Sequence, residues 1–328
     1  MKEIDTNTKQ PLVSVIMPTY NHAQYIGEAI DSVLNQTYKN FELIIIDNYS
    51  EDNTEKIVTS YKDDRIKYLK LRNNGVIAAS RNYGIRHSRG EYIAFLDSDD
   101  MWNKKKLEKQ LLHFQSSEIV GVASDAILIT DTPYYRGKNY GRSKLGYIDY
   151  KYIDILNGNP IMTSSCIVKR NIIENVGFFD ENRDFCFIED WELWLRMARF
   201  GKFRVLEDSL IFYLVSRKRG YQFPIISKNC LKIIKKQVDM NYVKYNDIKE
   251  VKALIYLSIA LTLLEYDRSQ SRKYCSKALE TTLNIRKKII SYGVMLISFY
   301  PTFLIKMILQ IFYKFDHFLY ALKDKLYS

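Results

Sequence analysis

The chain has 328 residues, of which 47% are apolar and 27% are charged, and its formal net charge is +11. This composition excludes an intrinsically disordered, collagen-like or small disulfide-rich protein, because the chain can bury a large core. The charge is unevenly distributed: residues 1–224 carry 31 basic and 30 acidic side chains, whereas residues 225–328 carry 18 and 8. We therefore expect two regions, a nearly neutral domain at 1–224 and a basic region at 225–328.

The N-terminal half alternates short apolar runs with helical patterns. Several of the runs are apolar at every position, which is typical of parallel strands covered on both faces. This pattern predicts an α/β fold of the nucleotide-binding type. In chain order, the expected elements are strands at 12–17, 43–46, 66–70 and 92–96, with helices at 23–36 and 76–87.

The alternation continues beyond residue 102. The segment 134–146 has no periodicity and many aromatic and basic residues, so it is either a solvated loop or a lid over an acceptor site. Beyond residue 224 the patterns are helical and rich in lysine, which predicts an all-α C-terminal extension. The further expected elements are a helix at 104–115, strands at 120–129 and 161–170, and a helix at 189–201.

Acidic residues follow two of the expected strands. Asp47 ends the second strand, and Asp97, Asp99 and Asp100 follow the fourth. Ligands of an open parallel sheet bind beyond the carboxyl ends of its strands, so these carboxylates are expected at a ligand site. The chain has neither a GxxxxGK[ST] phosphate-binding loop nor a GxGxxG pattern after the first strand, which excludes ATPase and dehydrogenase sites of those types.

The carboxylates of Asp97, Asp99 and Asp100 crowd onto one short turn, where their repulsion is costly unless a cation is present. Carboxylate oxygens are hard ligands that favour Mg²⁺ or Mn²⁺, and these ions commonly bridge to substrate phosphates. The turn therefore predicts a divalent metal, Mn²⁺ or Mg²⁺, and a diphosphate-bearing substrate. The alternative is an Asp-rich turn that only begins the helix at 104–115.

An ordered set of motifs lies within residues 13–217. The motifs are PTYN (18–21), SVLNQTY (32–38), a strand ending in Asp47, GVIAASRNYGI (75–85), EYIAFLDSDDMW (91–102) and GFFD with EDWELWLR (177–196). This set resembles family 2 of the inverting glycosyltransferases. The resemblance implies the GT-A fold, a Rossmann-like mixed sheet with helices on both faces, in an enzyme that uses a nucleotide-sugar donor.

The resemblance also implies a donor site. Each role suits its side chain, because tyrosine can stack on a base, a carboxylate accepts from ribose hydroxyls or a base N–H, and a guanidinium pairs with phosphate oxygens. From the residues alone, a surface position on a helix remains the alternative for Arg81. The implied roles are Pro18, Tyr20 and Asp47 at the nucleobase and ribose, Arg81 at the diphosphate or base, Asp97 at the ribose, and Asp99 at the metal.

The acidic pair Glu189 and Asp190 begins the helix expected at 189–201. Carboxylates are favoured there by free backbone N–H groups, so a purely structural helix start is one alternative. In the family that the chain resembles, an acidic residue here is the general base that deprotonates the acceptor hydroxyl during inversion. We expect Asp190 in this role, with Glu189 as the alternative. Trp191 and Trp194 are candidates for sugar platforms or, for Trp194, core.

The chain departs from the family pattern at two places. Asn48 stands where many relatives have a second aspartate, which leaves the nucleotide preference less defined. Residues 212–220 contain no histidine, whereas many relatives have one there that completes the metal shell. Arg217, Lys218 or Arg219 are therefore candidates for direct contacts to the diphosphate.

A 17-residue uncharged run at 289–305 follows Arg286, Lys287 and Lys288 in the basic region. It is slightly short for a membrane span and contains Pro301. Amphipathic helices lying on an anionic membrane surface are the favoured interpretation, with a helical subdomain or dimer contact and a true span as alternatives. No nucleic-acid-binding motif accompanies the basic residues, so no nucleic acid is expected.

The polar N-terminus shows no secretory signal and the four cysteines form no CxxC pair, which predicts a cytoplasmic enzyme. Together with the basic C-terminal region, this favours a peripheral position at the inner face of the cell membrane. We expect transfer of a sugar, first of all from a UDP-sugar, to a hydroxyl of a polyprenyl-diphosphate-linked oligosaccharide in bacterial surface-polysaccharide synthesis. Transfer to a polyprenyl phosphate is the competing reaction. The alternative that is not an enzyme is a catalytically silent membrane scaffold of the same fold. The sequence does not determine the oligomeric state, and a homo-oligomer is one of the options.

Overall fold

The structure is a computed structural model that describes residues 10–129, 145–214, 223–244, 248–264 and 267–282, together with residues 288, 291, 294 and 295. The chain divides into two compact units, Met1–Arg217 and Lys218–Ser328. The division falls close to residue 224, where the charge composition changes.

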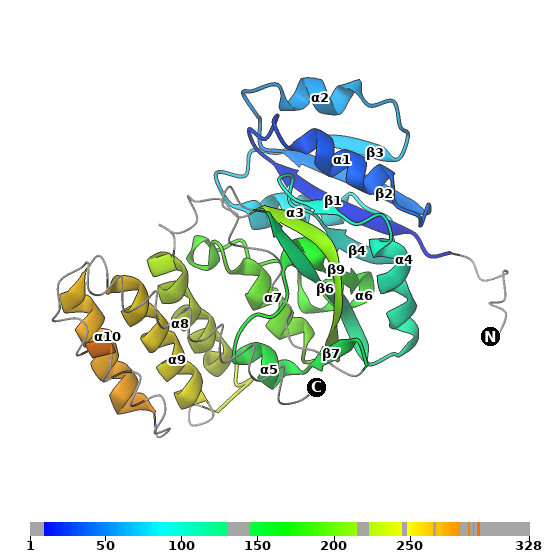
Figure 1. The fold of residues 1–328 in the computed structure, drawn as a ribbon. Helices are drawn as coiled ribbons and strands as arrows, with labels where there is room; N and C mark the ends of the chain where they lie inside the picture. The colour runs from blue at the N-terminus through cyan, green and yellow to red at the C-terminus, as the bar shows by residue number, and fades with distance from the viewer. Residues whose placement is uncertain are drawn as a thin grey trace, which may run out of the picture. The chain divides into compact units, whose positions relative to one another are not determined.

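The first unit is built on one mixed sheet (Figure 1). Its strands are β1 (Val13–Thr19), β2 (Phe41–Asp47), β3 (Ile66–Lys70), β4 (Tyr92–Phe95), β5 (Met101–Trp102), β6 (Ile119–Ile129), β7 (Tyr147–Tyr150), β8 (Ile167–Lys169) and β9 (Lys202–Leu214). Its α-helices are α1 (Ile26–Leu34), α2 (Thr54–Ser60), α3 (Ile77–Arg86), α4 (Lys106–Leu111), α5 (Tyr152–Leu156), α6 (Arg170–Val176) and α7 (Glu189–Met197). Short 3₁₀ turns are η1 (Leu112–Gln115), η2 (Thr163–Ser165) and η3 (Arg183–Phe185).

The strand order places several carboxyl ends at one edge. The order is β3-β2-β1-β4-β8-β6-β9-β5, with β7 paired to β9. The first four strands of that path are parallel, and the register sets Thr19 opposite Asp47 and Ile16 opposite Phe95. The segments after β1, β2 and β4 therefore emerge side by side, as expected for a ligand-binding edge.

Helices cover both faces of the sheet because the buried strands are apolar on both sides. On one face, Val15 of β1 and Ile30 of α1 belong to a single apolar cluster. On the other face, Ile16 and Ile46 lie against Gly84 of α3, where an added Cβ would come within 2.6 Å of the Ile46 side chain. Glycine at this position lets α3 approach the sheet closely.

Two of the expected elements differ from the structure. The strand expected at 161–170 is shorter: η2 replaces its first half, and only β8 pairs in the sheet. The helix expected at 189–201 ends at Met197, and Gly201 lies instead at the start of β9, where an added Cβ would be 2.3 Å from the Glu118 carbonyl oxygen. The candidate lid at 134–146 lies, apart from residues 145 and 146, outside the described residues.

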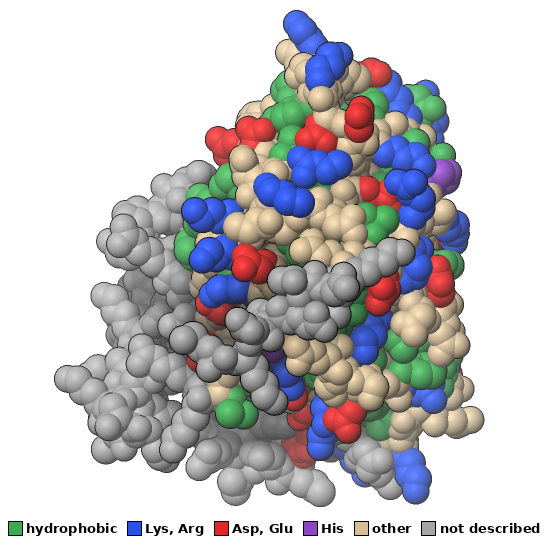
Figure 2. All heavy atoms as spheres, turned by 90° about the vertical axis from the view of Figure 1, so that its right-hand side faces the viewer, with side chains coloured by type: hydrophobic (Ala, Val, Ile, Leu, Met, Phe, Trp, Pro, Cys, Tyr) green, Lys and Arg blue, Asp and Glu red, His purple; other side chains and the backbone are tan. Residues whose placement is uncertain are grey.

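The surface charge of the chain is mixed where Figure 2 shows it. Lys and Arg side chains are interspersed with Asp and Glu on that face, in keeping with the nearly equal numbers of basic and acidic residues in 1–224.

The second unit is helical in its described part. Its helices are α8 (Phe223–Asp239), α9 (Lys249–Leu263) and α10 (Arg268–Thr281). Leu257 and Ala260 of α9 pack with Cys275 and Ala278 of α10 in one buried cluster. Among the described residues, no helix combines the length and apolar character needed to cross a bilayer. The run at 289–305 lies almost entirely outside these residues.

Candidate active site

The acidic turn at 97–100 lies directly after β4, and Asp100 anchors it. The Asp100 side chain is fully buried, accepting hydrogen bonds from Ser164 Oγ at 2.5 Å and from the Leu214 backbone N–H at 3.0 Å. Burial, together with the nearby carboxylates of Asp97 and Asp99, holds the pKa of Asp100 well above its usual range. Asp100 therefore fixes the turn to β9 and η2, while Asp97 and Asp99 remain partly exposed.

A buried arginine links this turn to the acidic pair on α7. Arg81 of α3 donates from Nη2 to Asp97 Oδ1 at 2.8 Å and from Nη1 to Glu189 Oε1 at 2.6 Å. Burial alone would lower the pKa of Arg81, but the carboxylates of Asp97 and Glu189 outweigh it and hold the pKa above its usual range. The guanidinium is thus a charged bridge between two sequence segments that lie on different elements.

The bridge does not use all of its polar atoms. Glu189 Oε2 and Arg81 Nε are buried and have no hydrogen-bond partner among the described residues. Such atoms are rare, since an unsatisfied buried polar group is costly. The Arg81 and Glu189 pair therefore retains one acceptor and one donor beside the site.

Asp190 is an oriented carboxylate with a raised pKa. Its Oδ2 accepts from Thr163 Oγ1 at 2.8 Å and from Asn159 Nδ2 at 3.3 Å, which orients the carboxylate. Desolvation of this partly exposed side chain by its packed surroundings, together with the adjacent Glu189 charge, raises the pKa of Asp190 to about 6. A carboxylate with this pKa is ionised at neutral pH, yet it accepts a proton more readily than an ordinary aspartate.

The segments after β1 and β2 form the neighbouring part of this edge of the sheet. Asp47 is buried, and its carboxylate accepts from the Ser50 backbone N–H at 2.9 Å, from Ser50 Oγ at 2.6 Å and from the Tyr68 hydroxyl. Pro18 is buried within β1, whereas the Tyr20 side chain is 48% exposed. Asp47 therefore shapes the edge of the site, and Tyr20 offers a ring to a ligand.

Hydrogen bonds join the loops around this edge. Asn21, in the left-handed region at φ 52°, donates its backbone N–H to Ser50 Oγ at 2.9 Å. His22 lies between two elements, with its N–H bonded to Thr54 Oγ1 at 3.1 Å and its ring Nδ1 2.8 Å from Ser98 Oγ. The loop after β1 is thereby fixed to the acidic turn after β4.

The residues at the acidic turn suit a hard divalent cation shared with phosphate. Asp99 is a partly exposed carboxylate, the ligand type that Mg²⁺ and Mn²⁺ prefer. Among the described residues, no group of three or more His, Cys, Asp or Glu side chains is arranged to hold a metal ion. A cation here would therefore draw further ligands from water and from a bound diphosphate.

Two predicted site residues, Trp191 and Trp194, do not face the site, and three others lie in a part of the chain that the structure does not describe. Trp191 and Trp194 are buried in the core rather than offered as sugar platforms, and Trp191 Nε1 donates to the Ile155 carbonyl oxygen at 2.7 Å. Arg217, Lys218 and Arg219 lie outside the described residues.

Thr163 and Ser164 hold Asp190 and Asp100 by hydrogen bonds, and the sequence motifs did not predict either residue. Their signal was the run of small hydroxyl residues at 163–165, which interrupts an apolar strand pattern.

Comparison of the sequence with known proteins identifies a family and several relatives. The profile of glycosyl transferase family 2 matches residues 14–177. The chain is 30% identical over 265 residues to "UDP-Glc:alpha-D-GlcNAc-diphosphoundecaprenol beta-1,3-glucosyltransferase WfgD" of Escherichia coli, covering 80% of this chain and 98% of that protein. It is 32% identical over 205 residues to an uncharacterised glycosyltransferase of Rickettsia typhi, covering 59% of this chain and 60% of that protein. It spans only 31% of a relative from Rickettsia conorii.

Solved structures share the fold. S. aureus TarS in complex with UDP superposes with a TM-score of 0.55 at 17% identity, covering 87% of this chain and 89% of that chain. The mannosyltransferase PcManGT from Pyrobaculum calidifontis, in complex with GDP-Man and Mn²⁺, gives a TM-score of 0.57 at 17% identity over 89% and 82% of the two chains. These similarities confirm the GT-A fold predicted from the sequence.

Proposed function

Because the chain belongs to glycosyl transferase family 2, we propose that it transfers a sugar from a nucleoside-diphosphate donor to a saccharide hydroxyl with inversion at the anomeric carbon. The observation that carries this proposal is Asp190, an oriented carboxylate whose pKa is raised to about 6. It is tied through Glu189 and Arg81 to Asp97 on the acidic turn. The base and the donor end of the site are thus held by one buried bridge.

The reaction needs one proton acceptor and one leaving group. The acceptor hydroxyl loses its proton to Asp190 Oδ1 or Oδ2 as its oxygen attacks the anomeric carbon of the donor. The bond from that carbon to the β-phosphate oxygen breaks at the same time, and the nucleoside diphosphate leaves from the opposite side. One in-line displacement of this kind inverts the anomeric configuration.

We assign the donor end to the residues at the edge of β1, β2 and β4. Tyr20 stacks on the base, Pro18 and Asp47 shape the pocket, and Asp97 accepts from the ribose. Asp99 would hold a divalent cation, Mn²⁺ or Mg²⁺, which neutralises charge on the leaving diphosphate when bound. Arg81 supports this end through Asp97 rather than by a free guanidinium. A UDP-sugar is the preferred donor, because the relative WfgD is named as an enzyme that uses UDP-Glc.

A lipid-linked acceptor fits the basic C-terminal region. The name of WfgD specifies a diphosphoundecaprenol acceptor, and TuaG of Bacillus subtilis, 48% identical over 108 residues, is named as a putative teichuronic acid biosynthesis glycosyltransferase. Residues 225–328 carry 18 basic and 8 acidic side chains, a composition suited to an anionic membrane surface. We therefore infer a peripheral enzyme at the inner membrane face that acts in surface-polysaccharide synthesis.

A donor screen tests the proposed reaction. Nucleoside diphosphate release is measured from a panel of nucleotide sugars, with Mn²⁺ or with EDTA, in the wild type and in Asp99→Asn. We expect UDP release from a UDP-sugar, and we expect this release to require both the metal and Asp99. Asp64→Asn, at an exposed position, is the control and should keep the release. Turnover that survives both EDTA and Asp99→Asn would refute the metal assignment. No release from any donor in the presence of lipid-linked saccharide acceptors would refute glycosyl transfer.

Vesicle flotation tests the membrane assignment separately. The full chain is compared with a variant in which Arg286, Lys287 and Lys288 are glutamine, on vesicles with and without anionic lipid. Each basic residue near an anionic surface contributes about 1 kcal/mol, so partitioning should fall by roughly two decades. Equal binding of both proteins, or no preference for anionic lipid, would contradict the assignment.

A further inference from the structure

Residues 157–162 form the loop between α5 and η2, and this loop lies beside Asp190. The indole N–H of Trp191 on α7 donates to the Ile155 carbonyl oxygen of α5 at 2.7 Å, which fixes the helix before the loop to α7. After the loop, the Thr163 hydroxyl donates to Asp190 Oδ2 at 2.8 Å. Both ends of the loop are therefore anchored to the helix that carries the proposed base.

Asn159 is an exposed residue of this loop, and its side chain contacts Asp190. Its Oδ1 accepts from the Ile161 backbone N–H at 3.1 Å, and its Nδ2 donates to Asp190 Oδ2 at 3.3 Å. These partners fix the orientation of the amide, because the backbone N–H requires the oxygen and the carboxylate requires the nitrogen. Pro160 also restricts the backbone of Asn159, the residue before it, to extended conformations.

Hydrogen-bonding capacity remains on both side chains. Asn159 Nδ2 has two N–H groups, of which one is used on Asp190 and the other has no partner among the described residues. Asp190 Oδ2 already accepts from two side chains, whereas Oδ1 accepts only from the Trp191 backbone N–H at 2.6 Å. A carboxylate oxygen accepts about two hydrogen bonds. Within the described part of the chain, one acceptor position on Oδ1 and one N–H on Nδ2 are therefore open to a substrate.

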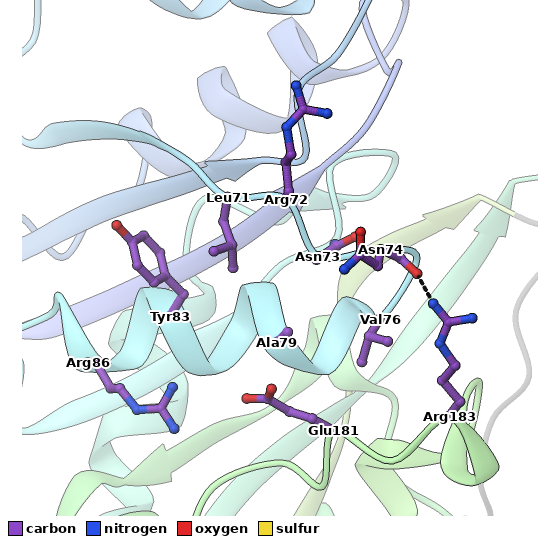
Figure 3. A pocket seen from close by; sticks show the side chains of 10 residues that line it. All are labelled: Leu71, Arg72, Asn73, Asn74, Val76, Ala79, Tyr83, Arg86, Glu181 and Arg183. Atoms are coloured by element: carbon purple, nitrogen blue, oxygen red, sulfur yellow. Dashed lines mark hydrogen bonds between the residues drawn. The ribbon is translucent and has the colours of Figure 1, made fainter.

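The segment that leads into α7 is held by contacts of its own. Glu181 Oε1 accepts from Asn82 Nδ2 of α3 at 2.8 Å. Arg183 Nη2 donates to the Asn74 carbonyl oxygen at 2.8 Å, as Figure 3 shows. Asp190 thus follows a segment bound to α3 and contacts a loop bound to α7, which holds its carboxylate and the Asn159 amide in place. A polar pair that is held in this way loses little conformational freedom when a substrate binds.

We propose that Asn159 determines acceptor specificity by binding the hydroxyl next to the one that Asp190 deprotonates; this inference rests on the proposed transfer reaction. The attacking hydroxyl donates to the open position on Asp190 Oδ1. The oxygen of the hydroxyl on the adjacent carbon accepts from the open N–H of Asn159 Nδ2. The expected acceptor is therefore a saccharide with hydroxyls on two adjacent ring carbons at the point of transfer. An acceptor without the second hydroxyl leaves the amide N–H unpaired and is disfavoured.

Asn159 also orients Asp190, and that role alone predicts a different result. If the amide only oriented the base, its removal would have the same effect on acceptors with and without the neighbouring hydroxyl. If the amide binds that hydroxyl, its removal affects only acceptors that carry the hydroxyl. The comparison of the two kinds of acceptor is a double-mutant cycle in which one of the two changes is made in the substrate.

Transfer is measured on the full chain, over a panel of nucleotide sugars, with farnesyl-diphosphate-linked glucose, galactose and N-acetylglucosamine as acceptors. Asn159→Ala should raise the KM for the accepted saccharide about 3- to 10-fold, as expected for the loss of one hydrogen bond. In the wild type, one of the two monodeoxy acceptors that lack a hydroxyl beside the point of transfer should show the same rise. In Asn159→Ala this deoxy acceptor should show no further rise, because the partner of the missing hydroxyl is already gone.

Asn157→Ala is the matched control, since Asn157 is exposed in the same loop but donates to the Ile153 carbonyl oxygen instead of Asp190. It should keep the wild-type KM. An unchanged KM in Asn159→Ala, or an equal effect of that variant on intact and deoxy acceptors, would overturn the proposal. Transfer to none of the three saccharides, with donor hydrolysis still present, would overturn it as well, because each of them has hydroxyls on adjacent carbons. No nucleoside diphosphate release from any donor would instead refute the proposed function.

Discussion

The turn at 97–100 and the pair formed by Glu189 and Asp190 contain the same kind of side chain in different surroundings. In each group one carboxylate is buried and holds the structure: Asp100 binds Ser164 and the backbone of β9, and Glu189 binds Arg81. The neighbouring carboxylates, Asp99 and Asp190, are partly exposed. The difference shows that burial and hydrogen-bond partners, rather than residue type, determine which acidic residue is available to substrates.

Replacement of Asp190 should have the largest effect on catalysis. Asp190→Asn removes the proposed base but keeps the shape of the side chain and its bond from Thr163. Turnover should fall about 10²- to 10⁴-fold with donor affinity nearly unchanged. Steady-state rates and nucleotide binding are measured together. Near-normal turnover in this variant, combined with a collapse in Glu189→Gln, would move the base to Glu189.

Removal of the buried bridge should have the largest effect on stability. Arg81→Met leaves Asp97 and Glu189 as buried or half-buried charges without their shared cation. The free energy of unfolding should fall by about 3–5 kcal/mol, as for other broken buried ion pairs. Denaturant unfolding measures the change, and adding Glu189→Gln should restore part of it.

Arg86→Met is the matched control for this experiment, since Arg86 lies on the same helix but is exposed. Its effect should stay within about 0.5 kcal/mol. If both variants lost the same free energy of unfolding, the loss would come from replacing any arginine on α3, and the buried bridge would add no stability.

The pH dependence of turnover should report the pKa of Asp190. Because this pKa is raised to about 6, protonation of the base begins well above the pH at which an ordinary aspartate titrates. The rate should therefore fall about tenfold per pH unit below about pH 6. A rate that is constant down to pH 4.5 would indicate that no group of this kind takes the proton.

Lys106 allows a test, with a smaller expected effect, of how burial changes the pKa of a charged side chain in the first unit. Its side chain is fully buried, Nζ lies 4.1 Å from the centroid of the Trp102 ring, and burial lowers its pKa to about 7. The unfolded chain therefore binds more protons than the folded chain between pH 7 and about 10.5, so stability rises with pH in that window.

Lys106→Met should be more stable than the wild type at pH 7 and should lack this rise of up to about 1.4 kcal/mol per pH unit. Thermal unfolding at several pH values measures both changes. Lys104→Met, an exposed position, should keep the rise. A wild-type stability that does not increase above pH 7 would contradict the lowered pKa.

Local patterns predicted much of this arrangement. Strands β1 to β4, helices α1 and α3, and the acidic turn lie close to the expected residues, because continuous apolar runs and helical periodicity are local signals. Contacts between residues far apart in the chain leave no such local pattern in the sequence. Arg81 and Glu189 are 108 residues apart, and nothing in their neighbourhoods predicts that they pair. The strand expected at 161–170 was predicted only in part, because its second half forms β8. Its hydroxyl residues Thr163 and Ser164 lie in the turn η2 and bind Asp190 and Asp100.

The anomeric configuration of the product tests the central assignment most directly. With the donor identified by the screen, proton NMR of the first-formed product compares its anomeric configuration with that of the donor sugar. The division of roles described above, with Asp190 as the single base opposite the leaving diphosphate, predicts inversion. Retention of configuration would contradict it, because retention requires a second displacement that these residues do not provide.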